Sequence, residues 1–135
     1  MQTIKAGCIL VDTNNKKVGL IYRSNHNDYS FPKGHLEGEE SLEECALRET
    51  AEETKRDCKI VKSISPHVQE YLTPRGEDCV CYTYVAVDDG PSSNTSTDTH
   101  DLVWVDLNKV EETLTYDSLK ELWREFREKV EKLCK

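Results

Sequence analysis

The stretch that decides the fold is FPKGHLEGEESLEECALRETAEETKR, residues 31–56. From about Glu40 to Lys55 it contains no Gly or Pro and is rich in Glu, Leu and Ala, which predicts a helix. A helical wheel places one set of residues on a single stripe: Leu42, Cys45, Ala46, Glu49 and Glu53. The first half of this stripe is apolar and the second half is acidic. Carboxylates therefore continue the face that should pack against a core.

Three acids, Glu49, Glu52 and Glu53, lie within about one and a half turns of this helix. Like charges at such spacing destabilise a helix, and partly buried carboxylates without a counter-charge cost more. A hard divalent cation removes both problems, and magnesium prefers oxygen ligands completed by waters or phosphates. The pattern therefore predicts a metal site for an anionic ligand. The competing interpretation is a solvated acidic helix face that serves as an interaction surface.

A tight turn, Phe31-Pro-Lys-Gly-His35, comes shortly before the helix. Gly34 allows a close approach to the backbone, and Lys33 and His35 can donate hydrogen bonds to phosphate oxygens. By itself the turn is a weak signal. Its spacing to the acidic helix makes it a candidate part of the same site.

The rest of the chain predicts a sheet and a second helix. Alternating, β-branched and aromatic residues predict strands over residues 4–10, 18–22, 29–32, 58–64, 67–72, 79–87 and 102–105. Residues 88–99 contain no large apolar side chain and predict a loop. Apolar residues three and four apart predict an amphipathic helix from Tyr116 to Leu133. Strands and two helices that interleave predict an α/β (α+β) sandwich around a mixed sheet, as one domain over residues 1–135.

Composition excludes several classes of protein. The chain has 135 residues, a formal net charge of −8 and no apolar run that approaches the length of a membrane span. The acidic charge argues against a stable nucleic-acid partner, which needs a basic face. The six cysteines form no Cys-x-x-Cys pair, and the N-terminus lacks the order of a signal peptide. We therefore expect a soluble cytoplasmic protein with reduced thiols.

Read together, Gly34, Glu40 and the run Arg48-Glu-Thr-Ala-Glu-Glu53 match the Nudix signature G-x5-E-x7-R-E-U-x-E-E-x-G-U. The chain resembles Nudix hydrolases, and the expected order of strands and helices is similar to that family's α/β/α sandwich. Three positions depart from the signature. Lys55 stands at the family's Gly, Arg56 at a hydrophobic position, and Thr50 at a usually aliphatic one.

The resemblance implies a magnesium-dependent hydrolase, with manganese as a possible substitute, in which metal ions bridge a substrate diphosphate and a water attacks phosphorus. It implies that Glu49 and Glu53 are the main metal ligands, that Glu52 is a ligand or the general base, and that the Lys33 carbonyl adds an oxygen. Arg48, which the resemblance places in the catalytic motif, is expected to pair with Glu40 and orient the acids.

The substrate is expected to be a nucleotide. The phrase Phe31-Pro-Lys-Gly-His-Leu-Glu37 is similar to that of diadenosine tetraphosphate hydrolases. Cys81-Tyr-Thr-Tyr-Val-Ala86 is similar to the strand that those enzymes use to stack adenine, so Tyr82 and Tyr84 are candidate base-binding residues, with core packing as the alternative. Arg75 is a candidate for a distal phosphate.

Dinucleoside polyphosphates are the favoured substrates. The alternatives are damaged nucleoside triphosphates, sugar nucleotides or capped RNA, and a non-catalytic nucleotide-binding module. No membrane partner is expected, and the protein is expected to be a monomer or a homodimer.

Overall fold

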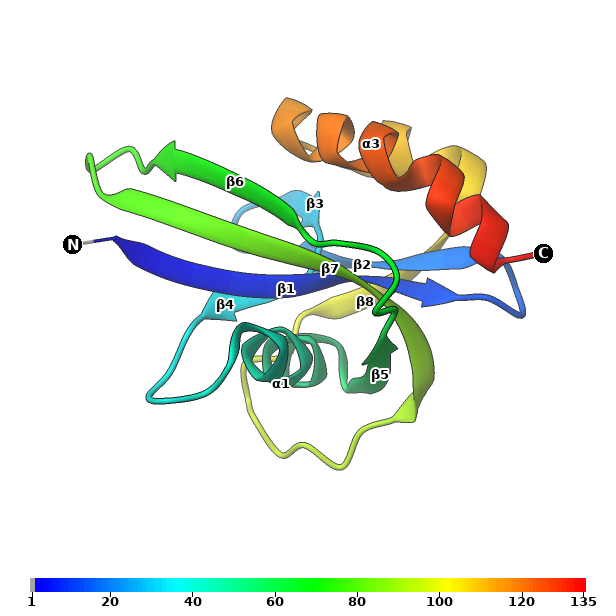
Figure 1. Cartoon of the computed structure of the whole chain (residues 1–135), viewed down its shortest axis with the longest axis horizontal. Helices are drawn as coiled ribbons and strands as arrows, with labels where there is room; N and C mark the ends of the chain where they lie inside the picture. Colours follow the sequence, from blue (N-terminus) through cyan, green and yellow to red (C-terminus); the bar gives the residue numbers. More distant parts are fainter. Residues whose placement is uncertain (1) are drawn as a thin grey trace.

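The structure is a computed structural model that describes residues 2–135, and it is built on a mixed eight-stranded sheet (Figure 1). Strand β1 (Thr3–Asp12) pairs antiparallel with β2 (Lys17–Arg23). At the centre, β1 runs parallel to β7 (Asp78–Pro91).

The remaining strands extend this centre on both sides. Strands β3 (Asp28–Ser30) and β8 (Asp101–Asp106) both pair with β2. Strands β5 (Arg56–Ile60) and β6 (His67–Leu72) pair with different parts of β7. The short strand β4 (Lys33–His35) pairs with β1 and carries the tight turn to the sheet.

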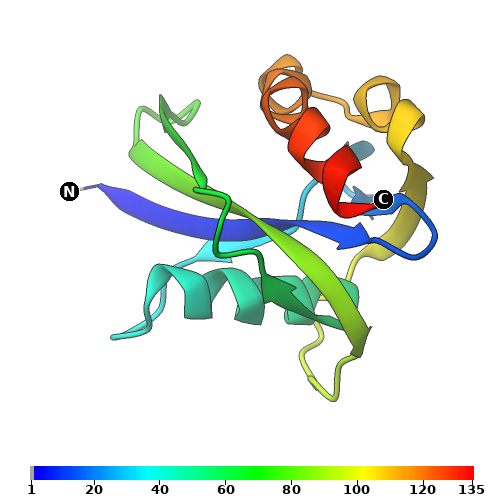
Figure 2. The ribbon, with the colours of Figure 1, turned by 45° about the vertical axis from the view of Figure 1, so that its right-hand side comes forward.

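Helices cover both faces of the sheet (Figures 1 and 2). Helix α1 (Leu42–Thr54) covers one face, and a capping box between Ser41 and Glu44 fixes its start. A 3-10 turn, η1 (Leu107–Lys109), leads into α2 (Val110–Thr113) and then α3 (Asp117–Leu133) on the other face. The α/β/α sandwich predicted from the sequence is confirmed.

Two apolar clusters hold these layers together. The larger one lies between the sheet and α3, where Trp123 and Phe126 are almost completely buried. The smaller one lies between the sheet and α1 and includes Ala6, Cys45 and Ala46, all with no exposed surface. The apolar half of the α1 stripe thus packs on the sheet, which fixes the direction in which its acidic half extends.

Several predicted strand boundaries are wrong. Strand β7 continues to Pro91, beyond the predicted end at residue 87, and β5 covers Arg56–Ile60 instead of residues 58–64. The cause is pairing between distant segments, since Arg56 lies opposite Pro91 and its guanidinium binds Asp88. The loop expected over residues 88–99 is therefore a loop only from residue 92 to residue 100.

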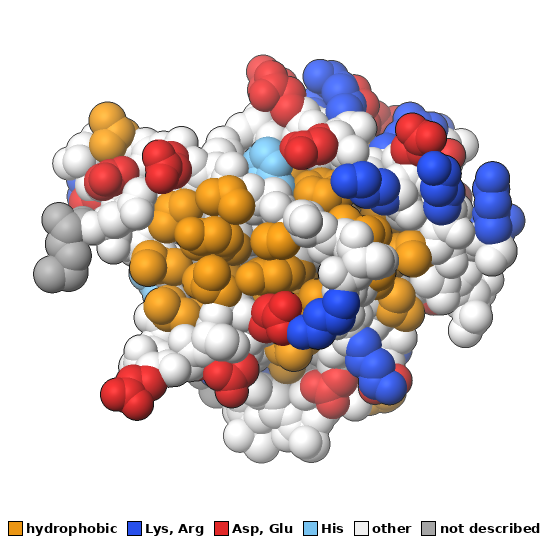
Figure 3. Space-filling view, in the orientation of Figure 1, with side chains coloured by type: hydrophobic (Ala, Val, Ile, Leu, Met, Phe, Trp, Pro, Cys, Tyr) orange, Lys and Arg blue, Asp and Glu red, His pale blue; other side chains and the backbone are white. Residues whose placement is uncertain are grey.

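Hydrophobic side chains are exposed together on one face of the molecule (Figure 3). Figure 3 shows hydrophobic side chains gathered in front of the sheet, on the side where β6 and β7 lie. On β6, Val68 is 51% exposed and Leu72 is 69% exposed.

All six cysteines are free. Among residues 2–135, no helix has both the length and the apolar character that a bilayer crossing needs.

Candidate active site

Strand β4 brings Gly34 directly against α1. A Cβ atom at Gly34 would lie 1.8 Å from Oε2 of Glu49, so any side chain there would displace this carboxylate. The Glu49 side chain is only 14% exposed in this position. The glycine expected to allow a close backbone approach does so, and the group that approaches is an acid of the helix.

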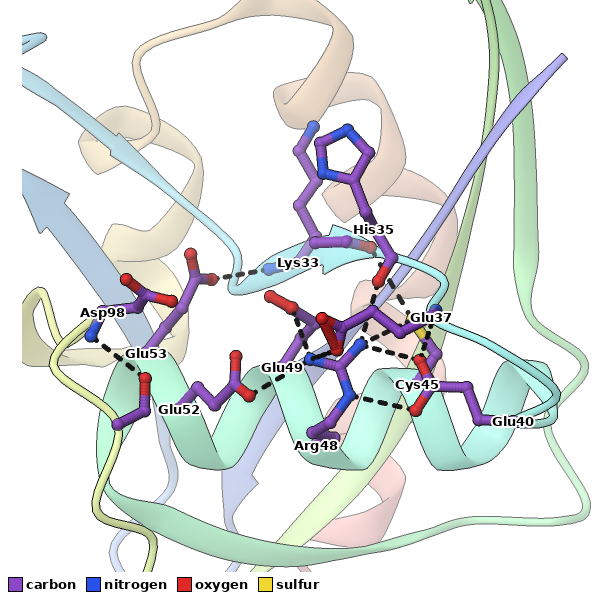
Figure 4. A network of polar contacts seen from close by, with 12 residues as sticks. Lys33, His35, Glu37, Glu40, Cys45, Arg48, Glu49, Glu52, Glu53 and Asp98 are labelled. Atoms are coloured by element: carbon purple, nitrogen blue, oxygen red, sulfur yellow. Dashed lines mark hydrogen bonds and ion pairs between the residues drawn. The ribbon is translucent and has the colours of Figure 1, made fainter.

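Arg48 connects the acids of this region (Figure 4). Its Nε and Nη2 donate to the two carboxylate oxygens of Glu40, at 3.0 and 2.7 Å. Its Nη1 donates to Glu49 at 2.8 Å and to Glu52 at 3.2 Å, and Nη2 also donates to the His35 carbonyl at 2.9 Å. The guanidinium holds the pKa of Glu40 down at about 2. One cation therefore ties the turn before α1 to two acids on the helix.

Glu53 lies in a different environment from Glu40. Its Oε1 accepts a hydrogen bond from the backbone N–H of Lys33 at 2.8 Å, and its Oε2 lies 3.7 Å from Nε2 of His100. The side chain is 13% exposed. Burial, helped by the charge of Glu49, raises the pKa of Glu53 to about 7, and burial also raises the pKa of Glu49. Glu49 thus shares the charge of Arg48 with Glu40 and Glu52, and Glu53 has no arginine or lysine at ion-pair distance within residues 2–135.

The acids open into a common cavity of about 660 Å³. Glu49, Glu52 and Glu53 line it from α1, and Lys33, Gly34 and His35 line it from β4. Thr97, Asp98, Thr99 and His100 close it from the loop before β8. As the side chains lie, no three His, Cys, Asp or Glu groups within residues 2–135 form a ready metal cluster. Arg48 instead holds two of the acids, and the Lys33 amide holds the third.

The donor set fits a hard divalent cation. Carboxylate oxygens dominate this wall of the cavity, and oxygen donors are what Mg²⁺ selects. Two of the acids have pKa values raised by burial, which is the physical sign of charge that a cation would stabilise.

The three departures from the sequence signature lie in different structural environments. Thr50 is completely buried, and its hydroxyl has no hydrogen-bond partner within residues 2–135. Arg56 binds Asp88 on β7. Lys55 caps α1 in the left-handed region, at φ 58° and ψ 31°, so the helix ends as it would with a glycine.

Lys55 also binds the loop of residues 92–100, which borders the cavity. Its Nζ donates to the carbonyls of Asn94 and Ser96, at 3.1 and 2.5 Å. Further along the same loop, the His100 N–H donates to the Glu53 carbonyl at 3.0 Å. A glycine at position 55 could not make the first two contacts. The lysine therefore holds a loop that the signature residue would leave free.

We expect Lys55→Gly to change activity more than stability. It relieves left-handed strain of roughly 1 kcal/mol but removes both hydrogen bonds to the loop. Hydrogen exchange of the amides in residues 92–100 should become faster, and turnover should fall by about tenfold as Asp98 and His100 lose their positions. Lys55→Met is the control, because it removes the bonds and keeps the strain. Unchanged exchange in Lys55→Gly would show that Lys55 does not hold the loop.

A second cavity, of about 480 Å³, adjoins the first. The two share four lining residues, and three of these, Lys5, Arg23 and Lys33, are cationic. The second cavity is otherwise lined by residues of β6, of the turn after it and of the start of α3, among them Tyr71 and Leu119. The Lys33 ammonium lies 5.9 Å from the centre of the Tyr71 ring. One cavity is thus acidic, its neighbour is aromatic, and cations lie between them.

The structure does not bring three of the candidate substrate-binding residues to either cavity. Tyr82 and Tyr84 share one face of β7, as expected, but this face packs towards α1. Tyr84 is 7% exposed. Arg75 is exposed in the turn between β6 and β7 and lines neither cavity. Neither tyrosine ring therefore lies beside a cavity: Tyr84 is part of the smaller core cluster, and the partly buried Tyr82 packs against it.

The sequence alone does not identify Arg23, Tyr71 or His100 as site residues. Only one signal pointed to Tyr71. Residues 67–72 alternate, so His67, Gln69 and Tyr71 had to share one face, but nothing in the sequence showed which face of the sheet that was. Arg23 and His100 reach the cavities through pairing of β2 with β3 and β8, which joins distant segments.

Comparison with known proteins agrees with this geometry. The family model described as NUDIX domain matches residues 1–128. The structure is similar to an Ap4A hydrolase from C. elegans in a binary complex, with 20% identity, a TM-score of 0.78, and coverage of 96% of this chain and 98% of that chain.

Two further solved structures are similar. A NUDIX hydrolase from Nitrosomonas europaea has 14% identity and a TM-score of 0.77, over 96% of this chain and 90% of that one. A MutT protein from Bacillus halodurans has 22% identity and a TM-score of 0.68, over 90% of this chain and 80% of that one. At these identities the structures support the shared fold.

The matching family model and the acid-lined cavity beside α1 together support a hydrolase enzyme. The chain belongs to the Nudix family. The resemblance stated from Gly34, Glu40 and the run from Arg48 to Glu53 is thereby confirmed.

Proposed function

We propose that this protein hydrolyses dinucleoside polyphosphates such as diadenosine tetraphosphate in a magnesium-dependent reaction. The observation that carries the proposal is the pair of adjoining cavities with cations between them. A mononucleotide would fill the acidic cavity and its rim. A nucleoside at each end of a long phosphate chain also uses the aromatic cavity.

In this proposal α1 and β4 hold the metal. Glu49 and Glu53 are the principal ligands, the Lys33 carbonyl adds an oxygen, and Glu52 is a further ligand or the general base. A bound magnesium ion would neutralise phosphate charge and lower the pKa of a water molecule. Arg48 and Glu40 position the acids through the contacts described above.

The other site residues orient the substrate. The Lys33 ammonium and the His35 ring donate to phosphate oxygens at the junction of β4 with the cavity. Gly34 keeps the backbone clear for Glu49 and for the phosphates. On the far side of the cations, the Tyr71 ring offers a face on which a base can stack.

A substrate panel with magnesium tests this function. We expect kcat/KM to be highest for diadenosine tetraphosphate among this compound, ATP, ADP-ribose and a sugar nucleotide. Tyr71→Ala should raise KM for the dinucleotide by about tenfold with little change in kcat, because a stacked base contributes about 1–3 kcal/mol.

Tyr82→Ala is the matched variant, since Tyr82 lies on the neighbouring strand and lines neither cavity. A rise in KM for Tyr82→Ala without one for Tyr71→Ala would place the base on the opposite face of the sheet. A preference for a mononucleotide over the dinucleotide would reject the proposed substrate class.

A further inference from the structure

Arg23, at the end of β2, lies where the two cavities meet. Its Nε and Nη2 donate to the two carboxylate oxygens of Asp28, at 2.8 and 2.6 Å. Asp28 is 1% exposed, and it also accepts a hydrogen bond of 2.6 Å from the hydroxyl of Tyr116 at the start of α3. Asp28 on β3 therefore holds the guanidinium, and Tyr116 in turn holds Asp28.

This fixation leaves donors free. An arginine has five N–H donors in a rigid plane, and the fork onto Asp28 uses one on Nε and one on Nη2. The remaining three N–H groups donate to no other side chain or carbonyl within residues 2–135, and the side chain is 30% exposed where it lines both cavities. Arg23 thus presents a preorganised set of donors that matches phosphate oxygens.

The surroundings of Arg23 favour a chain of phosphates over a single one. Lys5 and Lys33 line the same two cavities, and neither ammonium makes an ion pair within residues 2–135. Together with the Arg23 guanidinium, whose charge Asp28 partly neutralises, these two ammonium groups form a strip of cationic donors. The strip runs from the acids of α1 to the ring of Tyr71, so it follows the path between the two cavities.

We propose that Arg23 is a specificity-determining residue that binds the phosphates beyond the cleaved linkage and thereby selects substrates with three or more phosphates. This inference rests on the proposed function. A diphosphate held over the acids leaves the guanidinium without a phosphate, whereas a longer chain reaches it. Asp28 and Tyr116 are positioning residues, because they act through Arg23.

The same sheet contains a second arginine–aspartate pair that serves as a control. Arg56 forks onto Asp88 with nearly the same geometry, at 2.9 and 2.6 Å, and its side chain is 27% exposed. Neither Arg56 nor Asp88 lines either cavity. Arg56→Gln therefore leaves an aspartate unpaired as Arg23→Gln does, but away from any phosphate path.

The test measures binding of inorganic tripolyphosphate and pyrophosphate by calorimetry, without nucleotide, to wild type, Arg23→Gln, Arg23→Lys and Arg56→Gln. We expect Arg23→Gln to weaken tripolyphosphate binding at least tenfold and pyrophosphate binding less than threefold. Arg56→Gln should bind both as wild type does. Arg23→Lys keeps the charge beside Asp28 and should lose part of the preference for tripolyphosphate over pyrophosphate. If Arg23→Gln does not fold, Arg23→Lys provides the test.

A parallel kinetic measurement separates this inference from the proposed function. KM for diadenosine tetraphosphate should rise at least tenfold in Arg23→Gln with kcat nearly unchanged. The role of Arg23 would be overturned if Arg23→Gln lost affinity equally for tripolyphosphate and pyrophosphate. It would also be overturned if Arg56→Gln lost as much affinity for tripolyphosphate as Arg23→Gln. Tripolyphosphate binding that depends on Arg23, in a protein that does not cleave dinucleoside polyphosphates, would keep the role of Arg23 and reject the proposed substrate.

Discussion

Glu53→Gln should remove most of the turnover, by about 10³-fold at saturating substrate and magnesium. A metal ion supplies several kcal/mol of transition-state stabilisation, and each 1.36 kcal/mol corresponds to a factor of ten in rate. The change is isosteric, and a glutamine oxygen can still accept the hydrogen bond from the Lys33 amide. The loss would therefore report the charge of Glu53 and not its shape.

The control for this variant is Glu43→Gln on the same helix. Glu43 pairs with Lys62, its side chain is 39% exposed, and it does not line either cavity. Steady-state kinetics on diadenosine tetraphosphate should show near wild-type turnover for Glu43→Gln. If Glu53→Gln is as active as Glu43→Gln, Glu53 is not a metal ligand.

The free energy of unfolding of the metal-free protein should fall as the pH rises from about 4.5 to about 7. The ordinary pKa of Glu53 is 4.5, and burial raises it to about 7 in the folded protein. Between these values the folded state holds a proton that the unfolded state has lost, so each rise in pH favours unfolding. The loss amounts to about 3 kcal/mol and is complete above pH 7.

Glu53→Gln should flatten this dependence, because the amide does not titrate. The variant should therefore be more stable than wild type at pH 8 and nearly equal to it at pH 4.5. Urea denaturation across this pH range, with a chelator present, provides the measurement. If the free energy of unfolding of the wild type rises from pH 4.5 to pH 7 in the presence of the chelator, burial does not raise the pKa of Glu53.

Asp28 gives the opposite sign at lower pH. The Arg23 guanidinium holds its pKa down at about 2, below its ordinary value of 3.8. The stability from this pair is therefore present above pH 3.8 and is lost as the pH falls towards 2. The two acids titrate in separate pH ranges. The loss of stability on protonation of Asp28 therefore does not mask the effect of Glu53.

The most reliable prediction from the sequence concerned α1. The stripe of Leu42, Cys45 and Ala46 has a period that depends on neighbours along the chain, and the structure buries its apolar part. The same local geometry places Glu49 and Glu53 one turn further along the stripe, at the mouth of the cavity. Local periodicity was therefore enough to find the acids together.

Features that depend on distant segments could not be predicted in this way. A period of two placed Tyr82 and Tyr84 on one face of β7, but α1 covers that face, and this follows from the order of strands in the sheet. Arg23 and Tyr71 are 48 positions apart (71 − 23) and meet only because both lie beside the central strands. The extension of β7 to Pro91 likewise depends on its pairing with Arg56.

Calorimetric titration of the nucleotide-free protein with MgCl₂ and with MnCl₂ at pH 7.5 tests the central claim most directly, which is that the acids of α1 bind divalent cations. Wild type and Glu43→Gln should bind with the same affinity, and Glu53→Gln should bind at least tenfold more weakly. Equal binding by all three proteins, or no binding by any of them even with pyrophosphate present, would contradict a metal site at these acids.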